Sequence, residues 1–219
     1  DTMNCVMGHS MGGGAAILAA ATVGSGIKSL LAFAPAETTP SAISASTGVS
    51  IPSLIFAGNN DCVTPPATNQ RPMYDGLSSA CRQYIGIKGG SHCQMAGTST
   101  TCSFGEGTCS PAPTISRATQ HAIIDTFMVP WLRYTLLGSC PDGAAFDARM
   151  AADTSVTPQS NCTLCSTTGT NRWATTATVT AHPNPAHERL YINCTNEHYN
   201  QLQLLSADGR VLYSESWKP

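Results

Sequence analysis

The chain has 219 residues, of which 42% are hydrophobic and 11% are charged, and its formal net charge is −2. This length allows one core of good size, or one domain with a small additional module. The near-neutral charge and the lack of any run of roughly 18 apolar residues give no indication of nucleic-acid binding or of a transmembrane segment.

Residues 5–21 predict a strand, a sharp turn and a helix in direct succession. An apolar run, Cys5-Val6-Met7, precedes Gly8-His9-Ser10-Met11-Gly12, and a run of small residues follows over 13–21. This is the G-x-S-x-G pattern of a nucleophile elbow, in which a serine hydroxyl projects above a sheet from a strained corner. Small residues on both sides let the strand and the helix approach each other. A glycine-rich loop before a buried helix is the alternative.

Strand and helix patterns alternate along the chain after this turn. Apolar runs predict buried strands over residues 28–35, 51–58 and 82–87. Helical patterns occupy residues 66–80 and 115–137, where Pro130 predicts a kink. This alternation predicts an α/β fold, with a parallel sheet and crossover helices. The functional residues of such a sheet lie at the carboxyl ends of its strands.

The composition changes after Cys162. Residues 163–180 are rich in Thr and Ser, which predicts a linker, and strand-like stretches follow at 190–192, 202–205 and 211–213, with a turn at Asp208-Gly209. We expect a domain boundary near residue 170. The predicted parts are a catalytic domain over 1–165, a linker over 166–180 and a small all-β module over 181–219.

Two further residues complete the expected chemistry of Ser10. A serine hydroxyl needs a base, the base needs an orienting carboxylate, and the α/β-hydrolase order is Ser, then Asp or Glu, then His. Asp61 follows the predicted strand at 51–58, and His92 follows the strand at 82–87 after two glycines that would make its loop mobile. We expect His92 to accept the Ser10 proton, Asp61 to hold the His92 tautomer, and the Met11 amide to bind the oxyanion.

Each of these assignments has a simpler alternative. Asp61 could be a turn or N-cap aspartate, and His92 could be a surface-loop histidine. The Met11 side chain borders the substrate cleft or packs in the core, and His9 is expected in the cleft wall. Since nucleophile, base and oxyanion donor complete an acyl-transfer mechanism, no cofactor and no metal are expected.

Ten cysteines are many for a cytosolic protein of this size, and most of them lie in loops. Their number favours disulfides and an extracytoplasmic location. The C-x-x-C pattern at Cys162 and Cys165 is the single indication of a metal or redox site, and no convincing second pair accompanies it. We expect a Cys102–Cys109 disulfide, a bond from Cys140 to Cys162 or Cys165, and a buried free thiol at Cys5.

Residues 1 to about 165 resemble the carboxyl-terminal half of secreted bacterial cutinases and PET-hydrolase-like polyester hydrolases, a branch of the α/β-hydrolases. The matching stretches are 8–14, 52–58 with Asp61, 72–75 and 88–92. The resemblance implies an α/β-hydrolase fold and the triad of Ser10, Asp61 and His92, with Met11 in the oxyanion hole. It also implies an aromatic clamp after Pro35, where this chain has Ala, Glu and two Thr over 36–39. This departure argues against an aromatic polyester and leaves simpler esters open, and residues 93–114 look like an insertion.

The tail resembles the carboxyl-terminal sorting domain of the type IX secretion system, through residues 183–186, 190–192 and 207–211. This implies a contact with the secretion machinery and a secreted or cell-surface protein, and a small β adhesion module is the alternative. Because similar hydrolases carry about half of their catalytic domain before the elbow, the resemblance also implies that this sequence is a fragment. We then expect an open sheet edge at the elbow strand, a second oxyanion donor outside the sequence, and little activity in the fragment alone.

These observations together predict a secreted serine ester hydrolase that acts through an acyl-enzyme, of the cutinase, polyesterase or lipase type. An acyltransferase on the same fold and a non-catalytic surface-binding protein are the alternatives. The intact set of Ser10, Asp61 and His92 argues against the second of these.

Overall fold

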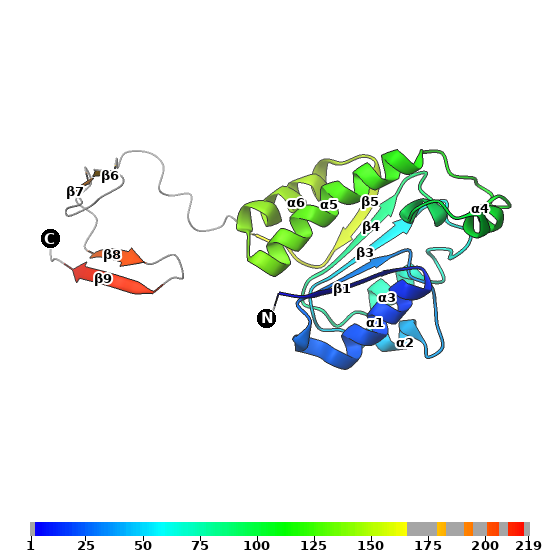
Figure 1. Ribbon diagram of the computed structural model, residues 1–219, viewed down its shortest axis with the longest axis horizontal. Coiled ribbons are helices and arrows are strands. Elements are labelled where there is room, and N and C mark those ends of the chain that lie inside the picture. The colour runs from blue at the N-terminus through cyan, green and yellow to red at the C-terminus, as the bar shows by residue number, and fades with distance from the viewer. Residues whose placement is uncertain (1–2, 166–178, 183–190, 195–200, 206–209, 217–219) are drawn as a thin grey trace. The chain divides into compact units, whose positions relative to one another are not determined.

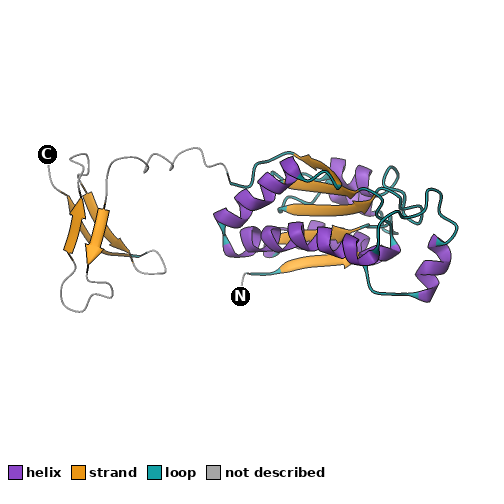
Figure 2. Ribbon diagram, turned by 90° about the horizontal axis from the view of Figure 1, so that it is seen from above, coloured by secondary structure: helices purple, strands orange, loops and turns teal. Residues whose placement is uncertain are grey.

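The computed structural model describes residues 3–165, 179–182, 191–194, 201–205 and 210–216. The chain divides into two compact units, Asp1–Ser166 and Thr167–Pro219. The first unit contains a sheet and helices, whereas the described residues of the second form strands (Figure 2). Among the described residues, no helix combines the length and the apolarity that a bilayer crossing requires.

A five-stranded sheet forms the centre of the first unit. Its order is β1 (Cys5–His9), β2 (Ser29–Phe33), β3 (Ser53–Gly58), β4 (Arg82–Ile87) and β5 (Val156–Ser160). The first four strands are parallel, and β5 is antiparallel to β4. The three inner strands are buried along nearly their whole length, as is typical of a parallel sheet that is covered on both faces. The predicted α/β fold is therefore confirmed, with β1 at one edge of the sheet.

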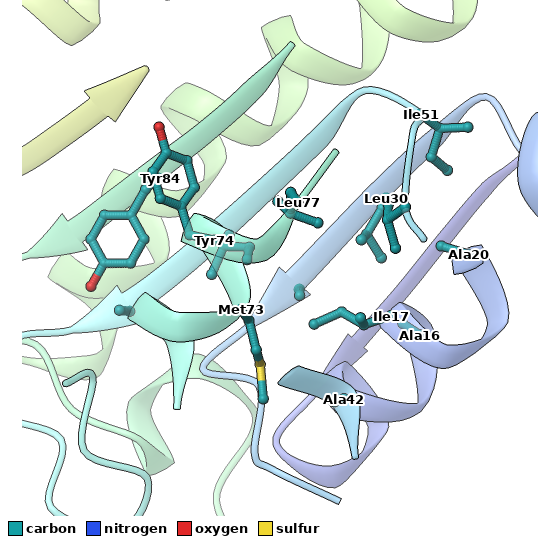
Figure 3. Packing of buried hydrophobic residues seen from close by; sticks show 14 residues of the cluster. Ala16, Ile17, Ala20, Leu30, Ala42, Ile51, Met73, Tyr74, Leu77 and Tyr84 are labelled. Atoms are coloured by element: carbon teal, nitrogen blue, oxygen red, sulfur yellow. The ribbon is translucent and has the colours of Figure 1, made fainter. Parts of the chain in front are cut away.

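Helices cover the two faces of this sheet (Figure 1). One face carries α1 (Met11–Val23), α2 (Ala42–Ser46) and α3 (Gln70–Gly76), and the other carries α5 (Arg117–Leu137) and α6 (Cys140–Ala152). On the first face, Ile17 of α1, Leu30 of β2 and Met73 of α3 are fully buried and belong to one cluster (Figure 3). On the second face, the buried rings of Phe127, Trp131 and Phe146 form the centre of another cluster.

The long helix α5 has clear start and stop signals in the sequence. The Ser116 hydroxyl accepts a hydrogen bond from the Thr119 amide (3.1 Å), which satisfies a free donor of the first turn. Gly138 follows the last turn with a φ of 68°, a conformation that favours glycine. The helix continues through Pro130 as one element.

Several elements were not predicted from the sequence: α2, α4 (Thr100–Glu106), α6, β5 and the 3-10 turns η1 (Gly24–Gly26) and η2 (Cys93–Met95). Strand β5 contains Pro158, which cannot donate a ladder hydrogen bond and is tolerated because β5 lies at the sheet edge. The sheet is consequently mixed, and not wholly parallel.

The described residues of the second unit form two antiparallel pairs. Strand β6 (Val179–His182) pairs with β7 (Tyr191–Cys194), and β8 (Gln201–Leu205) pairs with β9 (Val211–Ser216). Strands β7, β8 and β9 overlap the strand-like stretches of the sequence, whereas β6 overlaps the end of the predicted linker. The rest of that linker beyond residue 165, the stretch 183–186 and the turn at Asp208-Gly209 lie outside the described residues.

Candidate active site

Ser10 stands at a strained corner between β1 and α1. Its φ of 58° and ψ of −125° are rare for a residue with a side chain. The corner is tight because Gly8 lies against the far side of the turn: a Cβ at Gly8 would overlap the carbonyl group of Gly12. A Cβ at Gly12 would meet no described atom within 4 Å. Only the first glycine of the G-x-S-x-G pattern is therefore required for this close approach.

Backbone hydrogen bonds hold the corner in place. The Ser10 amide donates to the Phe33 carbonyl (3.0 Å), and the Ser10 carbonyl accepts from the amides of Gly13 (2.9 Å) and Ala36 (2.9 Å). The Met11 amide lies in the first turn of α1, where an amide has no acceptor within the helix. It is thus available to a negatively charged group beside Ser10.

Of the three residues expected to form a triad, His92 lies within hydrogen-bond distance of both Ser10 and Asp61. His92 Nε2 is 2.9 Å from Ser10 Oγ, and His92 Nδ1 is 2.8 Å from Asp61 Oδ2. Asp61 and His92 are 5% and 2% exposed, so water has little access to their contact. The residues follow β1, β3 and β4, whose carboxyl ends lie at the same edge of the sheet.

Asp61 also fulfils the turn role that was its alternative. One carboxylate oxygen, Oδ1, accepts hydrogen bonds from the amides of Val63 and Thr64, both at 2.8 Å. The other oxygen, Oδ2, faces His92 and the Thr64 hydroxyl (2.9 Å). The turn therefore fixes the direction of the carboxylate toward the imidazole.

The loop that carries His92 is attached to α5 by a buried glutamine. Gln120 Oε1 accepts from the Ser91 amide and Gln120 Nε2 donates to the Ser91 carbonyl, both at 2.9 Å. Gln120 is fully buried. The two glycines before His92 were expected to make this loop mobile, but one of them, Gly90, closely approaches Gln120. The loop is thus held against the helix.

His9 packs against the imidazole of His92, with 4.7 Å between the ring centroids. Its Nε2 lies 3.2 Å from the His92 carbonyl and donates to it, since a carbonyl can only accept. Burial lowers the pKa of His9 below its usual value, and the neighbouring His92 lowers it further. The ring is therefore neutral at pH 7 and supports the His92 loop from the side of Ser10.

The Met11 side chain is 71% exposed, which excludes the alternative that it packs in the core. It borders a groove of about 570 Å³, whose other lining residues are Ala15, Leu18, Glu37, Thr38 and Thr39. Glu37 is fixed here because its carboxylate accepts a hydrogen bond from the Ile43 amide (2.9 Å). Three of the four residues found in place of the expected aromatic clamp, Glu37, Thr38 and Thr39, thus line the groove that Met11, the residue after Ser10, also borders.

Four disulfides are present in the described residues: Cys62–Cys109, Cys81–Cys162, Cys93–Cys102 and Cys140–Cys165. The expected Cys102–Cys109 bond is wrong, because α4 occupies most of the intervening span and carries Cys109 away from Cys102. Of the two alternatives for Cys140, Cys165 is the partner. Cys5 is a free thiol, as expected, but is only half-buried.

Two of these disulfides start directly beside the candidate catalytic residues. Cys62 follows Asp61, Cys93 follows His92, and both are bonded to the segment 102–109. This segment lies within residues 93–114, the insertion expected from the sequence. Since Cys162 and Cys165 belong to different disulfides, their C-x-x-C pattern forms no metal or redox site. The described residues contain no cluster of three or more His, Cys, Asp or Glu side chains that could hold a metal ion.

The sequence reasoning missed three buried polar residues around the triad: Thr64, Gln70 and Gln120. Gln120 was detectable, because it stands in line with Ile124, Phe127 and Trp131 on the buried stripe of α5. A polar residue in such a stripe must find a buried hydrogen-bond partner. Thr64 and Gln70 lie in a loop and a short helix, where no periodicity marks them.

Comparison with known protein families places the candidate site within a family match. A family model described as PET hydrolase-like (PETase) matches residues 1–110. This range contains Ser10, Asp61 and His92. No curated protein matches the chain.

Proposed function

The chain belongs to the PET hydrolase-like family of α/β-hydrolases, and from this premise we propose that it is a serine ester hydrolase with Ser10 as nucleophile, His92 as base and Asp61 as orienting carboxylate. The family supports an ester hydrolase of the cutinase or polyesterase type. The proposed serine mechanism is supported above all by two hydrogen-bond contacts of His92. Its Nε2 lies 2.9 Å from Ser10 Oγ, and its Nδ1 lies 2.8 Å from Asp61 Oδ2.

The proposed reaction begins with the transfer of the Ser10 proton to His92 Nε2 while Ser10 Oγ attacks the ester carbonyl. Asp61 keeps the proton of the neutral imidazole on Nδ1, which leaves Nε2 free to accept, and it stabilises the imidazolium that forms. The Met11 amide donates to the developing oxyanion. His92 then protonates the departing alcohol, and a water molecule activated by His92 releases the acid from Ser10.

The groove beside Met11 supports a simple ester as the substrate. Its apolar side is formed by Met11, Ala15 and Leu18, which can contact an aliphatic acyl chain. Its other side is formed by Glu37, Thr38 and Thr39, so no aromatic ring from this stretch faces the substrate. We infer a preference for aliphatic over aromatic acyl groups.

A nitrophenyl ester and a fluorophosphonate probe test this function in the full-length protein. The wild type should release nitrophenol and become labelled at Ser10, and Ser10→Ala should lose both, with kcat reduced by at least about 10,000-fold. Ser44→Ala is the matched control, because Ser44 is exposed on α2 and should leave both readouts unchanged. Labelling of another residue, or Ser10-independent hydrolysis, would refute the proposal.

We also infer that the protein acts outside the cytoplasm and that residues 181–219 serve its export. Four disulfides support the first point, because such bonds persist in oxidising compartments. Deletion of residues 181–219 should leave the esterase in the cells, and unchanged secretion of the shortened protein would exclude an export role for this module.

A further inference from the structure

Two buried polar residues next to the triad have no role in the mechanism as described so far. Thr64 is 7% exposed and Gln70 is fully buried. Thr64 lies in the turn after Asp61, and Gln70 is the first residue of α3. A buried polar side chain destabilises a fold unless its hydrogen bonds are satisfied, so the direction of each bond matters.

The orientation of the Gln70 amide follows from its neighbours. Its Nε2 lies 2.7 Å from the Pro35 carbonyl and 3.1 Å from Thr64 Oγ1. A carbonyl oxygen can only accept, so the group that faces Pro35 must be the NH2 group. Nε2 therefore donates to both Pro35 and Thr64, and the Thr64 hydroxyl accepts from Gln70.

The proton of the Thr64 hydroxyl then has a defined direction. Thr64 Oγ1 lies 2.9 Å from Asp61 Oδ2 and 2.9 Å from His92 Nδ1. Nδ1 must carry its own proton, because it is 2.8 Å from a carboxylate oxygen that can only accept. A second acceptor, the Ala34 carbonyl, lies farther away at 3.4 Å and is uncharged, so the Thr64 hydroxyl donates to the Asp61 carboxylate at 2.9 Å. Its oxygen is then a second acceptor for the proton on His92 Nδ1. One donated and two accepted bonds fill the capacity of a hydroxyl group.

This arrangement saturates the carboxylate of Asp61. Oδ1 receives the amides of Val63 and Thr64, and Oδ2 receives the Thr64 hydroxyl and His92 Nδ1. The Asp61 carboxylate cannot rotate without losing several of these bonds at once. The Thr64 oxygen, as a second acceptor 2.9 Å from Nδ1, also favours the His92 tautomer that carries its proton on Nδ1 and leaves Nε2 free.

The same bonds connect Asp61 to the loop that supports the nucleophile. Gln70 binds the Pro35 carbonyl, and the next residue, Ala36, donates its amide to the Ser10 carbonyl (2.9 Å). The chain of contacts thus runs from Asp61 through Thr64 and Gln70 to the Ser10 corner. The loops after β1, β2 and β3 are joined by side chains that do not themselves react.

Gln70 provides a second and independent observation. Its Oε1 is buried and has no hydrogen-bond partner among the described residues. An unsatisfied buried carbonyl lowers stability, and an apolar residue at this place would avoid that loss. The hydrogen bonds that the Gln70 side chain makes to the described residues are the two that its NH2 group donates, to Pro35 and Thr64.

We propose that Thr64 and Gln70 are positioning residues, which hold the Asp61 carboxylate and the His92 ring in the reactive arrangement through a directed pair of hydrogen bonds. This inference rests on the proposed function, because it assigns a role in the reaction of Ser10. It goes further in assigning roles to two residues that touch neither the substrate nor the nucleophile.

The first test compares Thr64→Val with Thr64→Ser in the full-length protein. Valine keeps the shape but loses the hydroxyl, so kcat for a nitrophenyl ester should fall roughly 10- to 100-fold, the worth of a hydrogen bond to a charged group. KM should stay within about twofold, because the groove is untouched. Serine keeps the hydroxyl and should restore kcat to within about threefold of the wild type. The rate of fluorophosphonate labelling at Ser10 should follow kcat.

The second test removes the Gln70 donor without introducing a charge. In Gln70→Met a thioether side chain of similar length replaces the amide, so residue 70 can no longer donate to Thr64 or to the Pro35 carbonyl. We expect a similar fall in kcat with unchanged KM. In the Thr64→Val background the same substitution should have little further effect on kcat, because the relay is already broken.

The outcomes distinguish a failure of the positioning role from a failure of the proposed esterase function. Wild-type kcat in Thr64→Val, an equal loss in Thr64→Ser, or additive losses in the double variant would each overturn the positioning role. If Thr64→Val does not fold, as judged by its thermal midpoint, unchanged kcat in Gln70→Met is sufficient to overturn it. If hydrolysis by the wild type does not depend on Ser10, then the proposed function itself fails, and with it this inference.

Discussion

The two glycines of the G-x-S-x-G pattern should respond in opposite ways to the same substitution. In Gly8→Ala the new methyl group would overlap the Gly12 carbonyl and lie 2.8 Å from the Gly13 amide nitrogen. These are backbone atoms, so the corner itself must open. We expect a loss of unfolding free energy of at least about 3 kcal/mol. At about 2–4 °C per kcal/mol, the thermal midpoint should fall by roughly 6–12 °C.

Gly8→Ala should also impair catalysis more than stability alone would suggest. Opening the corner displaces Ser10 Oγ from His92, and a shift of about 1 Å lowers kcat/KM by about 100-fold. Gly12→Ala is the matched control, because its methyl group would meet no described atom within 4 Å at an exposed position of α1. Alanine favours a helix over glycine by up to about 1 kcal/mol, so the midpoint should stay the same or rise.

The assay is urea and thermal unfolding of both variants, with nitrophenyl ester hydrolysis measured well below the transition. Equal losses in the two variants would show that the pattern acts through general flexibility and not through one close approach. A Gly8→Ala variant with the stability and activity of the wild type would refute the reasoning completely.

Two other properties should follow from the cysteines. The double variant Cys62→Ala with Cys109→Ala should lose about 4 kcal/mol of unfolding free energy in urea, because this disulfide closes a sequence separation of 47 residues. Cys93→Ala with Cys102→Ala should lose about 2.6 kcal/mol, because that disulfide closes a separation of 9 residues. A larger loss in the second variant would contradict the chain-entropy argument. Burial raises the pKa of Cys5 from 9.0 to about 11, so its thiolate is scarce at pH 8 and iodoacetamide should modify it about 100-fold more slowly than an ordinary thiol. The rate, followed by mass spectrometry in the folded protein, should rise with pH toward 11, and rapid modification at pH 8 would contradict the burial.

The sequence predicted the elements whose signals are local. Strands β2, β3 and β4 are apolar runs that are buried on both faces, and the Ser10 corner has its own short pattern. Strand β5 escaped prediction because it forms by pairing with β4 at the sheet edge, and Pro158 obscures its strand character. Helices α2 and α4 are short, so their stability depends on neighbours that the sequence does not reveal.

In the candidate site, too, the sequence predicted residues with local signals and missed those that depend on distant contacts. Ser10, Asp61 and His92 could be assigned because each follows a predicted strand, and topology brings the ends of parallel strands together. The partners of Cys102 and Cys109 could not, since pairing depends on which loops meet in space. Thr64 and Gln70 were missed because their roles depend on hydrogen-bond directions that only coordinates provide.

The disulfides beside Asp61 and His92 connect the two loops of the proposed active site by a second covalent path. Along the backbone, Asp61 and His92 are joined by the whole of β4 and α3, but the disulfides Cys62–Cys109 and Cys93–Cys102 join them through the short stretch 102–109. A protease that nicks the chain once between residues 63 and 92 therefore leaves the acid and the base tethered to each other. Such a nicked enzyme should remain one molecule under oxidising conditions and separate into two pieces only after unfolding and reduction.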